Sequence, residues 1–255
     1  MNKASVTYIT NSGVCIEYKD KKILIDAVHT ETALPYLSVD NAVLEKMLLN
    51  KEPYNNIDLM LFTHHHIDHF DAKSCNEILK RNKHAQLVGT QNVLSQIKAA
   101  DNYNDVLISQ LWGMQIPMGT SMQICLKDIP CEISCVTHDG AENAGVLNYT
   151  YMFEVRRKVF LHVGDAQVSV KNFEPTPIFN RKIDVLMVPF TFIGLTEGRK
   201  VISKINPQKL LVMHLPDRKY DKMNWGLKTA KVYKKYASEL PDTVFLEEPG
   251  QSVLI

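Results

Sequence analysis

The sequence contains few cysteines, and their spacing follows no pattern. There are five in 255 residues, at positions 15, 75, 125, 131 and 135. An odd number at irregular spacing favours reduced thiols over a disulfide framework. Cys131 and Cys135 could form half of a metal site, but no second cysteine pair completes a tetrahedron. We therefore expect both to be core thiols.

A strong net charge and long apolar runs are also missing. The 29 basic side chains nearly balance 28 acidic ones, for a net charge of +1. Such a balance creates no overall field that would attract nucleic acid or a membrane. No apolar run approaches the roughly 20 residues that span a bilayer, and residues 1–5 show no apolar signal region. These absences predict a cytoplasmic protein, and they leave the oligomeric state open.

The sequence does contain enough apolar residues, 45%, to bury a large core. Alternating strand and helix patterns predict one α/β domain over residues 1–255. The expected strands cover residues 6–18 with a turn at 11–13, then 23–26, 57–62, 86–89, 106–108, 121–126, 131–137, 149–155, 159–163, 183–189, 209–213, 244–246 and 252–255. The expected helices cover residues 39–50, 72–81, 90–100, 196–205 and 223–240, and residues 190–195 are expected to form a loop.

Histidines and aspartates are concentrated between the expected strand 57–62 and the expected helix 72–81. The pattern is H-x-H-x-D-H, formed by His64, His66, Asp68 and His69. Imidazole and carboxylate groups suit zinc, manganese or iron, and a turn after a strand can direct several of them at one point. His65 occupies an "x" position, so we leave it outside the metal set.

This pattern resembles the signature of the metallo-β-lactamase-fold hydrolases. The resemblance implies a four-layer αββα sandwich with an internal two-fold repeat. Residues 15–26 and 149–165 support such a repeat, because both run from a strand through a charged turn to a second strand and an aspartate. The resemblance also implies ligands at three later strand ends, where this chain has His138, Asp165 and His214.

By resemblance, these seven residues hold two divalent metal ions, zinc first, with manganese or iron as alternatives. One metal is assigned to His64, His66 and His138, the second to Asp68, His69 and His214, and Asp165 bridges them. With a bridging hydroxide the site has a net charge of about +1, which favours an anionic small-molecule substrate. The implied reaction is attack by that hydroxide on an ester, lactone or phosphodiester, with Asp68 orienting it.

Other residues are expected around this site. Asp26 ends a strand and is expected beside the metal histidines or, alternatively, in an ordinary turn. His162 is expected either behind the metal ligands or elsewhere in the core, and His29 is expected in an exposed loop or, alternatively, lining the pocket. The segment 27–56 is a candidate roof. Phe190, Phe192 and Arg199 are candidate pocket residues, and Arg199 is alternatively a solvated arginine on a helix face.

The residues after the motif narrow the resemblance. Phe70 and Asp71 stand where many members have two glycines, and this ending is similar to the branch that holds ascorbate-phosphate lactonase and N-acyl phosphatidylethanolamine phospholipase D. The expected activity is therefore that of a lactonase or phosphodiesterase more than of a β-lactamase. The alternative is a metal-dependent binding or sensor protein of the same fold with weak catalysis.

Overall fold

The structure, a computed structural model, describes residues 3–155 and 157–255. Met1, Asn2 and Arg156 lie outside the described residues. Arg156 is one of the basic residues of the charged turn that the sequence predicts between 149 and 165. The described chain divides into two compact units. The N-terminal unit contains the residues up to Ala33, Leu37–Gln115 and Glu248–Ile255, and the C-terminal unit contains Leu34–Tyr36 and Ile116–Glu247.

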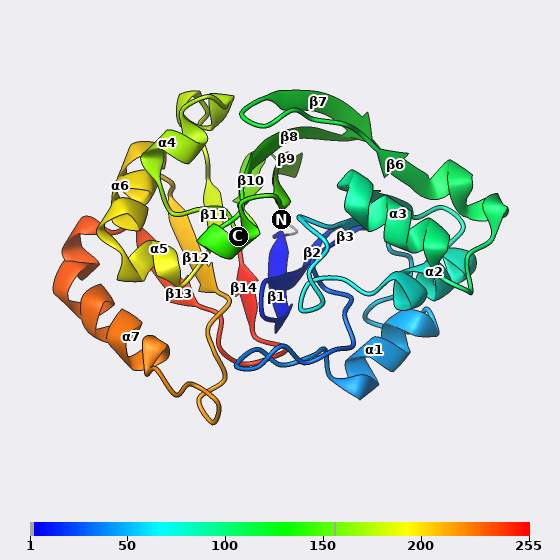
Figure 1. The fold of residues 1–255 in the computed structure, drawn as a ribbon, viewed down its shortest axis with the longest axis horizontal. Coiled ribbons are helices and arrows are strands. Elements are labelled where there is room, and N and C mark those ends of the chain that lie inside the picture. Colours follow the sequence, from blue (N-terminus) through cyan, green and yellow to red (C-terminus); the bar gives the residue numbers. More distant parts are fainter. Residues whose placement is uncertain (1–2, 156) are drawn as a thin grey trace. The chain divides into compact units, whose positions relative to one another are not determined.

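The N-terminal unit is built on a mixed seven-stranded sheet in the order β14-β1-β2-β3-β4-β5-β6. Figure 1 shows β14, β1, β2 and β3 of this sheet. Its strands are β1 Ser5–Thr10, β2 Gly13–Tyr18, β3 Lys21–Ile25, β4 Leu59–Leu61, β5 Gln86–Gly89, β6 Leu111–Gly113 and β14 Ser252–Leu254. Strands β14 to β3 pair antiparallel, and β3 to β6 pair parallel. Helices α1 Asn41–Leu48, α2 Ala72–Arg81 and α3 Gln91–Ala99 share one hydrophobic core with the sheet.

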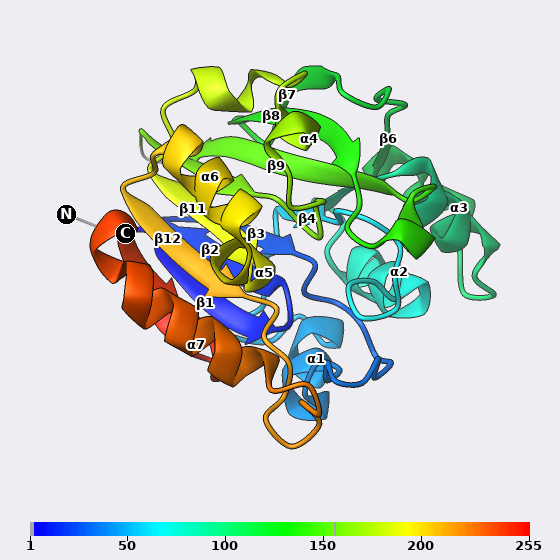
Figure 2. The ribbon, with the colours of Figure 1, turned by 60° about the vertical axis from the view of Figure 1, so that its left-hand side comes forward.

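The C-terminal unit repeats this plan in the order β13-β12-β11-β10-β9-β8-β7. Its strands are β7 Ser121–Leu126, β8 Ile129–Thr137, β9 Leu147–Val155, β10 Lys158–His162, β11 Val185–Pro189, β12 Lys209–Met213 and β13 Asp242–Phe245. Strands β7 to β10 pair antiparallel, and β10 to β13 pair parallel. Its helices are α4 Val170–Phe173, α5 Thr191–Gly194, α6 Thr196–Ile205 and α7 Trp225–Tyr236. Figure 2 shows α5 and α6 over β11 and β12.

Each sheet has a buried aspartate at the equivalent position near its middle. Asp58 precedes β4 and accepts a hydrogen bond from the backbone N–H of Lys22 at 2.9 Å. Asp184 precedes β11 and accepts one from the backbone N–H of Val159, also at 2.9 Å. Both carboxylates are less than 9% exposed, and each hydrogen bond joins two neighbouring parallel strands. This shared network supports an internal repeat.

The network also fixes how the two halves align. If Lys22 corresponds to Val159, then Asp26 corresponds to Val163. The backbone agrees, because the Asp26 N–H bonds the Leu61 carbonyl and the Val163 N–H bonds that of Met187 at matching strand positions. The expected pairing of Asp26 with Asp165 is therefore shifted by two residues. Gly164, with φ 57°, supplies the left-handed turn that the shift needs.

Most of the expected elements are present, and the helix of residues 72–81 has the bounds and the cap that the sequence predicts. The Asp71 carboxylate accepts a hydrogen bond from the Ser74 N–H at 2.8 Å. Thr90 caps α3 in the same way. Both caps are predictable from the sequence because a capping side chain bonds a backbone N–H only three residues away and needs no tertiary contact.

Two expectations about local structure are wrong. Residues 106–108 are not a strand but belong to a 3-10 helix, η1 (Asp105–Gln110), which Asn104 caps through the Val106 N–H at 3.0 Å. The loop expected at residues 190–195 contains helix α5 instead. Its aromatic and aliphatic side chains belong to the hydrophobic core, and that burial stabilises a single helical turn.

The cysteines behave as expected for unpaired thiols. All five are free, and all except Cys125 are buried. Burial raises the pKa of Cys131 to about 12 and that of Cys135 to about 11, which keeps both protonated at neutral pH. Among the described residues, no helix combines the length and apolar character that crossing a bilayer requires.

The repeated aspartate makes a prediction about stability. Asp184→Ala removes the acceptor of the Val159 N–H and a partner of Lys158 at 3.1 Å. We expect a loss of about 1–3 kcal/mol in the free energy of unfolding, measured by equilibrium urea denaturation. Asp58→Ala should behave alike. Glu197→Ala removes only a surface pair with Lys200 and should change little; equal losses for Asp184→Ala and Glu197→Ala would contradict this account.

Candidate metal centre

In the N-terminal unit, the turn between β4 and α2 holds the histidine motif. His64 and His69 have no exposed surface and Asp68 is 9% exposed, while His66 is half-buried. The Asn11 amide donates to the Asp68 carbonyl at 3.2 Å and to that of Leu37 at 3.1 Å. Asn11 therefore ties the motif to the β1–β2 turn, a role that the sequence did not suggest.

Asp26 and Thr63 determine which nitrogen of His64 carries hydrogen. The Thr63 N–H donates to Asp26 Oδ1 at 2.8 Å, and the Thr63 hydroxyl donates to Oδ2 at 2.7 Å, because a carboxylate can only accept. With its single hydrogen used, Thr63 Oγ1 accepts from His64 Nδ1 at 2.9 Å. The lone pair of His64 therefore lies on Nε2, the atom available to a metal.

Asp26 orients His69 in the same way. Its Oδ2 accepts from His69 Nδ1 at 3.0 Å, which again leaves the lone pair on Nε2. Asp26 is completely buried at the end of β3, where φ is 47°. One carboxylate thus fixes two imidazoles, and Asp26 lies beside the motif as the sequence led us to expect.

The donor atoms of the motif lie close together. A ligand atom of His64 lies within 4.8 Å of a ligand atom of His66. A ligand atom of Asp68 lies within the same distance of a ligand atom of His69. The rings of His64 and His66 are 4.6 Å apart between centroids, and His69 Nε2 is 3.8 Å from Asp68 Oδ2. These spacings suit shared coordination of a cation.

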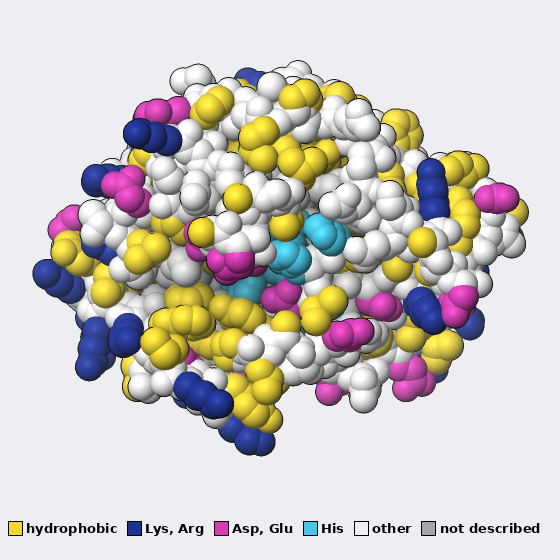
Figure 3. All heavy atoms as spheres, in the orientation of Figure 1, with side chains coloured by type: hydrophobic (Ala, Val, Ile, Leu, Met, Phe, Trp, Pro, Cys, Tyr) yellow, Lys and Arg dark blue, Asp and Glu magenta, His cyan; other side chains and the backbone are white. Residues whose placement is uncertain are grey.

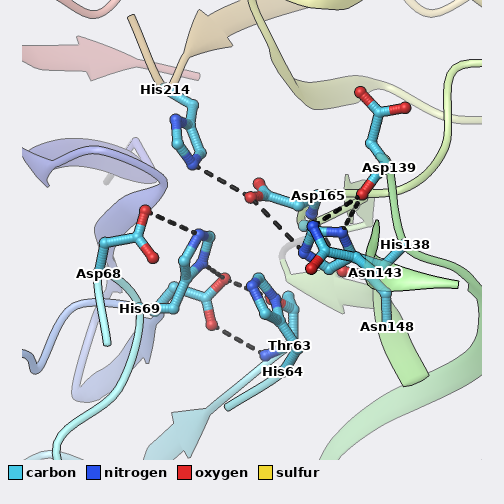
Figure 4. A network of polar contacts seen from close by, with 12 residues as sticks. Thr63, His64, Asp68, His69, His138, Asp139, Asn143, Asn148, Asp165 and His214 are labelled. Carbon is cyan, nitrogen blue, oxygen red and sulfur yellow. Dashed lines mark hydrogen bonds and ion pairs between the residues drawn. The ribbon is translucent and has the colours of Figure 1, made fainter. Parts of the chain in front are cut away.

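The C-terminal unit holds a second set of donors at strand ends. His138 follows β8, Asp165 follows β10, and His214 follows β12. His214 Nε2 lies 3.1 Å from Asp165 Oδ2, and His138 Nε2 lies 3.9 Å from the same oxygen (Figure 4). His138 Nδ1 donates to the Asp139 carbonyl at 2.6 Å, so its lone pair also lies on Nε2.

Asn148 holds the segment that carries Asp165. Its amide NH2 donates to the Val163 carbonyl at 2.8 Å, and its Oδ1 accepts from the Asp165 N–H at 3.0 Å. Asn148 lies on β9 and is completely buried. Burial also raises the pKa of the neighbouring Asp139, with a further rise from the Asp165 charge.

Part of the candidate roof belongs to the C-terminal unit. The Tyr36 ring meets the His214 ring edge-on, with centroids 4.1 Å apart. The Pro35 carbonyl accepts from the Asp217 N–H at 2.9 Å, on the segment that follows His214. Residues 34–36 therefore contact the candidate ligand His214 and the segment that follows it.

The other two histidines singled out in the sequence are both buried. His162 accepts a hydrogen bond from the Gly164 N–H at 3.1 Å through Nδ1, which helps to shape the turn before Asp165. The expectation that His29 is exposed is wrong, because it has no exposed surface. Burial, and then the nearby His69, lower the pKa of His29 to about 4, so the ring is neutral at pH 7.

The candidate pocket residues have structural contacts instead. Phe192 is completely buried in the core of the C-terminal unit, so it presents no surface to a ligand. Phe190 is 7% exposed and stacks on Trp225 at 6.0 Å. The Arg199 guanidinium donates to the Ile193 carbonyl at 2.8 Å and lies 4.3 Å from the Tyr236 ring. Arg199 therefore holds the end of α5, and its half-buried guanidinium also donates to the Thr196 hydroxyl at 3.0 Å.

A family model described as "Beta-lactamase superfamily domain" matches residues 5–214, and the chain belongs to this family. Its two mixed sheets with flanking helices have the α/β fold of the metallo-β-lactamases, as expected. No curated protein matches the sequence.

Solved structures give the same fold at low identity. The chain is similar to a possible metal-dependent hydrolase from Veillonella parvula (TM-score 0.67, 14% identity, covering 99% of this chain and 100% of that chain). It is also similar to the metallo-β-lactamase fold protein YhfI from Bacillus subtilis (0.65, 15%, 100% and 100%). A third is an isothiocyanate hydrolase from Delia radicum gut bacteria (0.66, 13%, 98% and 99%). At such identities the likeness concerns the fold alone.

The hydrogen bonds of Asp26 make a prediction about metal affinity. Asp26→Ala frees both His64 and His69, so we expect zinc affinity to fall about 10- to 100-fold, measured by competition with a chromogenic chelator. Thr63→Val releases only His64 and should have a smaller effect. Asp40→Ala, which removes a helix cap in the same unit, is the matched control. Unchanged affinity in both folded variants would refute the role of Asp26.

Proposed function

We propose that this chain is a metal-dependent hydrolase that opens an ester, a lactone or a phosphodiester. In this proposal the two units form one domain, and their donor sets meet around two divalent metal ions. Zinc is the first choice, with manganese or iron as alternatives. The observation that carries the proposal is the hydrogen bonding of His64, His69 and His138, which presents the Nε2 lone pair of each as a ligand.

The residues present fit such metals. Two ligands on a tetrahedral zinc, each about 2.1 Å from the ion, lie about 3.4 Å apart. The separation of 3.1 Å between His214 Nε2 and Asp165 Oδ2 is close to this value. A mixture of imidazole and carboxylate donors suits zinc, manganese and iron better than it suits calcium or magnesium, which prefer oxygen ligands.

We assign the ligands as the family pattern implies. His64, His66 and His138 would hold the first metal, Asp68, His69 and His214 would hold the second, and Asp165 would be shared by both. When bound, the two metals supply Lewis acidity and lower the pKa of water toward about 7. The remaining positive charge favours an anionic substrate or a developing oxyanion.

Asp68 is proposed to have two functions, as ligand and as proton acceptor. Asn11 fixes its backbone, so the carboxylate is held within 3.8 Å of His69 Nε2. A carboxylate oxygen in that position accepts a hydrogen bond from the attacking water and orients its lone pair. The role of Asp26 is to keep both neighbouring imidazoles in the tautomer that carries hydrogen on Nδ1.

The substrate class rests on the residues that follow the motif. Phe70 and Asp71 favour a lactonase or a phosphodiesterase over a β-lactamase. The isothiocyanate hydrolase among the similar structures adds a further electrophilic carbon to test. All of these substrates are attacked at a polarised centre by water, which is the chemistry that the donor set supports.

The first test is metal content with activity. Protein reconstituted with zinc or manganese should hold up to two metals per chain by elemental analysis, and should hydrolyse at least one member of a panel of lactones, phosphodiesters, β-lactams and isothiocyanates. Chelation should abolish turnover. Absence of metal after reconstitution would overturn the proposal. Full metal loading without turnover on any member would favour the binding or sensor protein.

The second test is Asp68→Ala. Loss of the proton acceptor should lower turnover about 10²- to 10⁴-fold, with little change in the unfolding midpoint. Asp71→Ala is the matched control, because it removes the α2 cap and should cost about 1 kcal/mol of stability with turnover kept. Turnover within a few-fold of wild type in Asp68→Ala would show that this residue has no such role.

A further inference from the structure

The near-neutral net charge hides a strongly basic segment. Residues 217–236, here called the loop–helix segment, comprise a loop followed by α7. They contain seven basic and two acidic side chains, a net charge of +5 in a chain whose total is +1. Basic side chains line the edge of the molecule over α7 in Figure 3, and the preceding loop projects beyond the sheet in Figure 2.

Three large apolar side chains are exposed among these charges. Met223, Trp225 and Leu227 are 57%, 38% and 65% exposed. Asp221 accepts hydrogen bonds from the N–H groups of Trp225 and Gly226, both at 2.9 Å, which joins the loop to the first turn of α7. Met223 and Leu227 are the most exposed of the three, and Trp225 also packs on Phe190. Exposed apolar side chains among basic ones are a feature of interaction surfaces.

We propose that the loop–helix segment docks on the surface of an anionic lipid bilayer. Met223, Trp225 and Leu227 would enter the interfacial layer, and the lysines around them would meet the phosphate groups. Interleaved Lys and apolar residues with a tryptophan are typical of segments that lie at a membrane interface. Each basic side chain near an anionic surface strengthens the attraction, and salt weakens it.

A protein partner fits these observations less well. Protein interfaces are depleted in lysine, whereas this surface carries Lys219, Lys222 and Lys228 beside the apolar side chains. Three exposed apolar side chains also fall short of the roughly 800 Å² per partner that a stable protein interface buries. Reversible attachment to a bilayer needs only a shallow apolar contact combined with several positive charges.

The docking surface is connected to a candidate metal ligand within the C-terminal unit. Trp225 stacks on Phe190 with ring centroids 6.0 Å apart. The Phe190 N–H in turn donates to the Met213 carbonyl at 2.9 Å, immediately before His214. A bilayer contacted at Trp225 would therefore lie on the side of this unit where β12 presents His214. This inference does not depend on the proposed hydrolysis.

The test is sedimentation with vesicles. The protein is mixed with phosphatidylcholine vesicles containing 0 or 40% phosphatidylglycerol, at low and high salt. We expect binding to the anionic vesicles only, and weakening in high salt. Lys222→Glu/Lys228→Glu should lower the lipid affinity at least about twentyfold. Lys51→Glu/Lys98→Glu is the matched control, with the same charge change on exposed lysines of the N-terminal unit, and should have a much smaller effect.

The apolar contribution is tested separately. Met223→Ser/Leu227→Ser should weaken binding, whereas Val106→Ser/Ile108→Ser, which alters two other exposed apolar side chains, should not. Trp112→Phe leaves Trp225 as the only tryptophan, and its emission should shift to shorter wavelength on anionic vesicles. Absence of vesicle binding at low salt would overturn the proposal. Equal binding by the target and control variants would also overturn it. A third contrary result is self-association of the protein that the loop–helix variants abolish, with no binding to lipid.

Discussion

The buried carboxylate of Asp26 is the interaction on which the N-terminal donor set depends. Removing a carboxylate from water is costly unless hydrogen bonds replace its hydration. Here Thr63 provides two of them and His69 a third. The same bonds that make burial tolerable also decide where the hydrogens lie on two imidazoles. Stability and metal-binding competence therefore come from one group, and neither can be changed without the other.

The C-terminal unit positions its donors by different means. Its counterpart of Asp26 is Val163, so no carboxylate stands at the end of β10 itself. Instead, Asn148 holds the backbone from Val163 to Asp165 through two hydrogen bonds. The Asp139 carbonyl accepts from His138 Nδ1 and so determines the tautomer of that imidazole. The repeated sheets preserve the buried aspartates that join their central strands, while the strand ends have diverged. A repeat can thus conserve its scaffold and still place unlike ligands at equivalent edges.

The sequence was sufficient where local rules decide the structure. Asp71 and Thr90 were recognisable as caps, and His64, His138 and His214 as residues that follow strands. The roles of Asn11, Thr63 and Asn148 were not visible, because each depends on a partner that is distant in the chain or on the direction of a single hydrogen. No pattern of residue types carries that information.

The errors have a related physical origin. His29 was expected to be exposed because a polar loop residue usually is, yet tertiary packing buried it completely. For Arg199 the sequence offered a solvated side chain or an anion ligand, and it did not suggest the contacts with the end of α5 and the Tyr236 ring. The net charge of +1 is a sum over the chain, and it does not show that the loop–helix segment alone has a net charge of +5. The contacts that bury His29 and engage Arg199 involve residues that are distant in the chain, such as His69 and Tyr236. Such contacts are decided by tertiary packing, so the local pattern of residue types does not predict them.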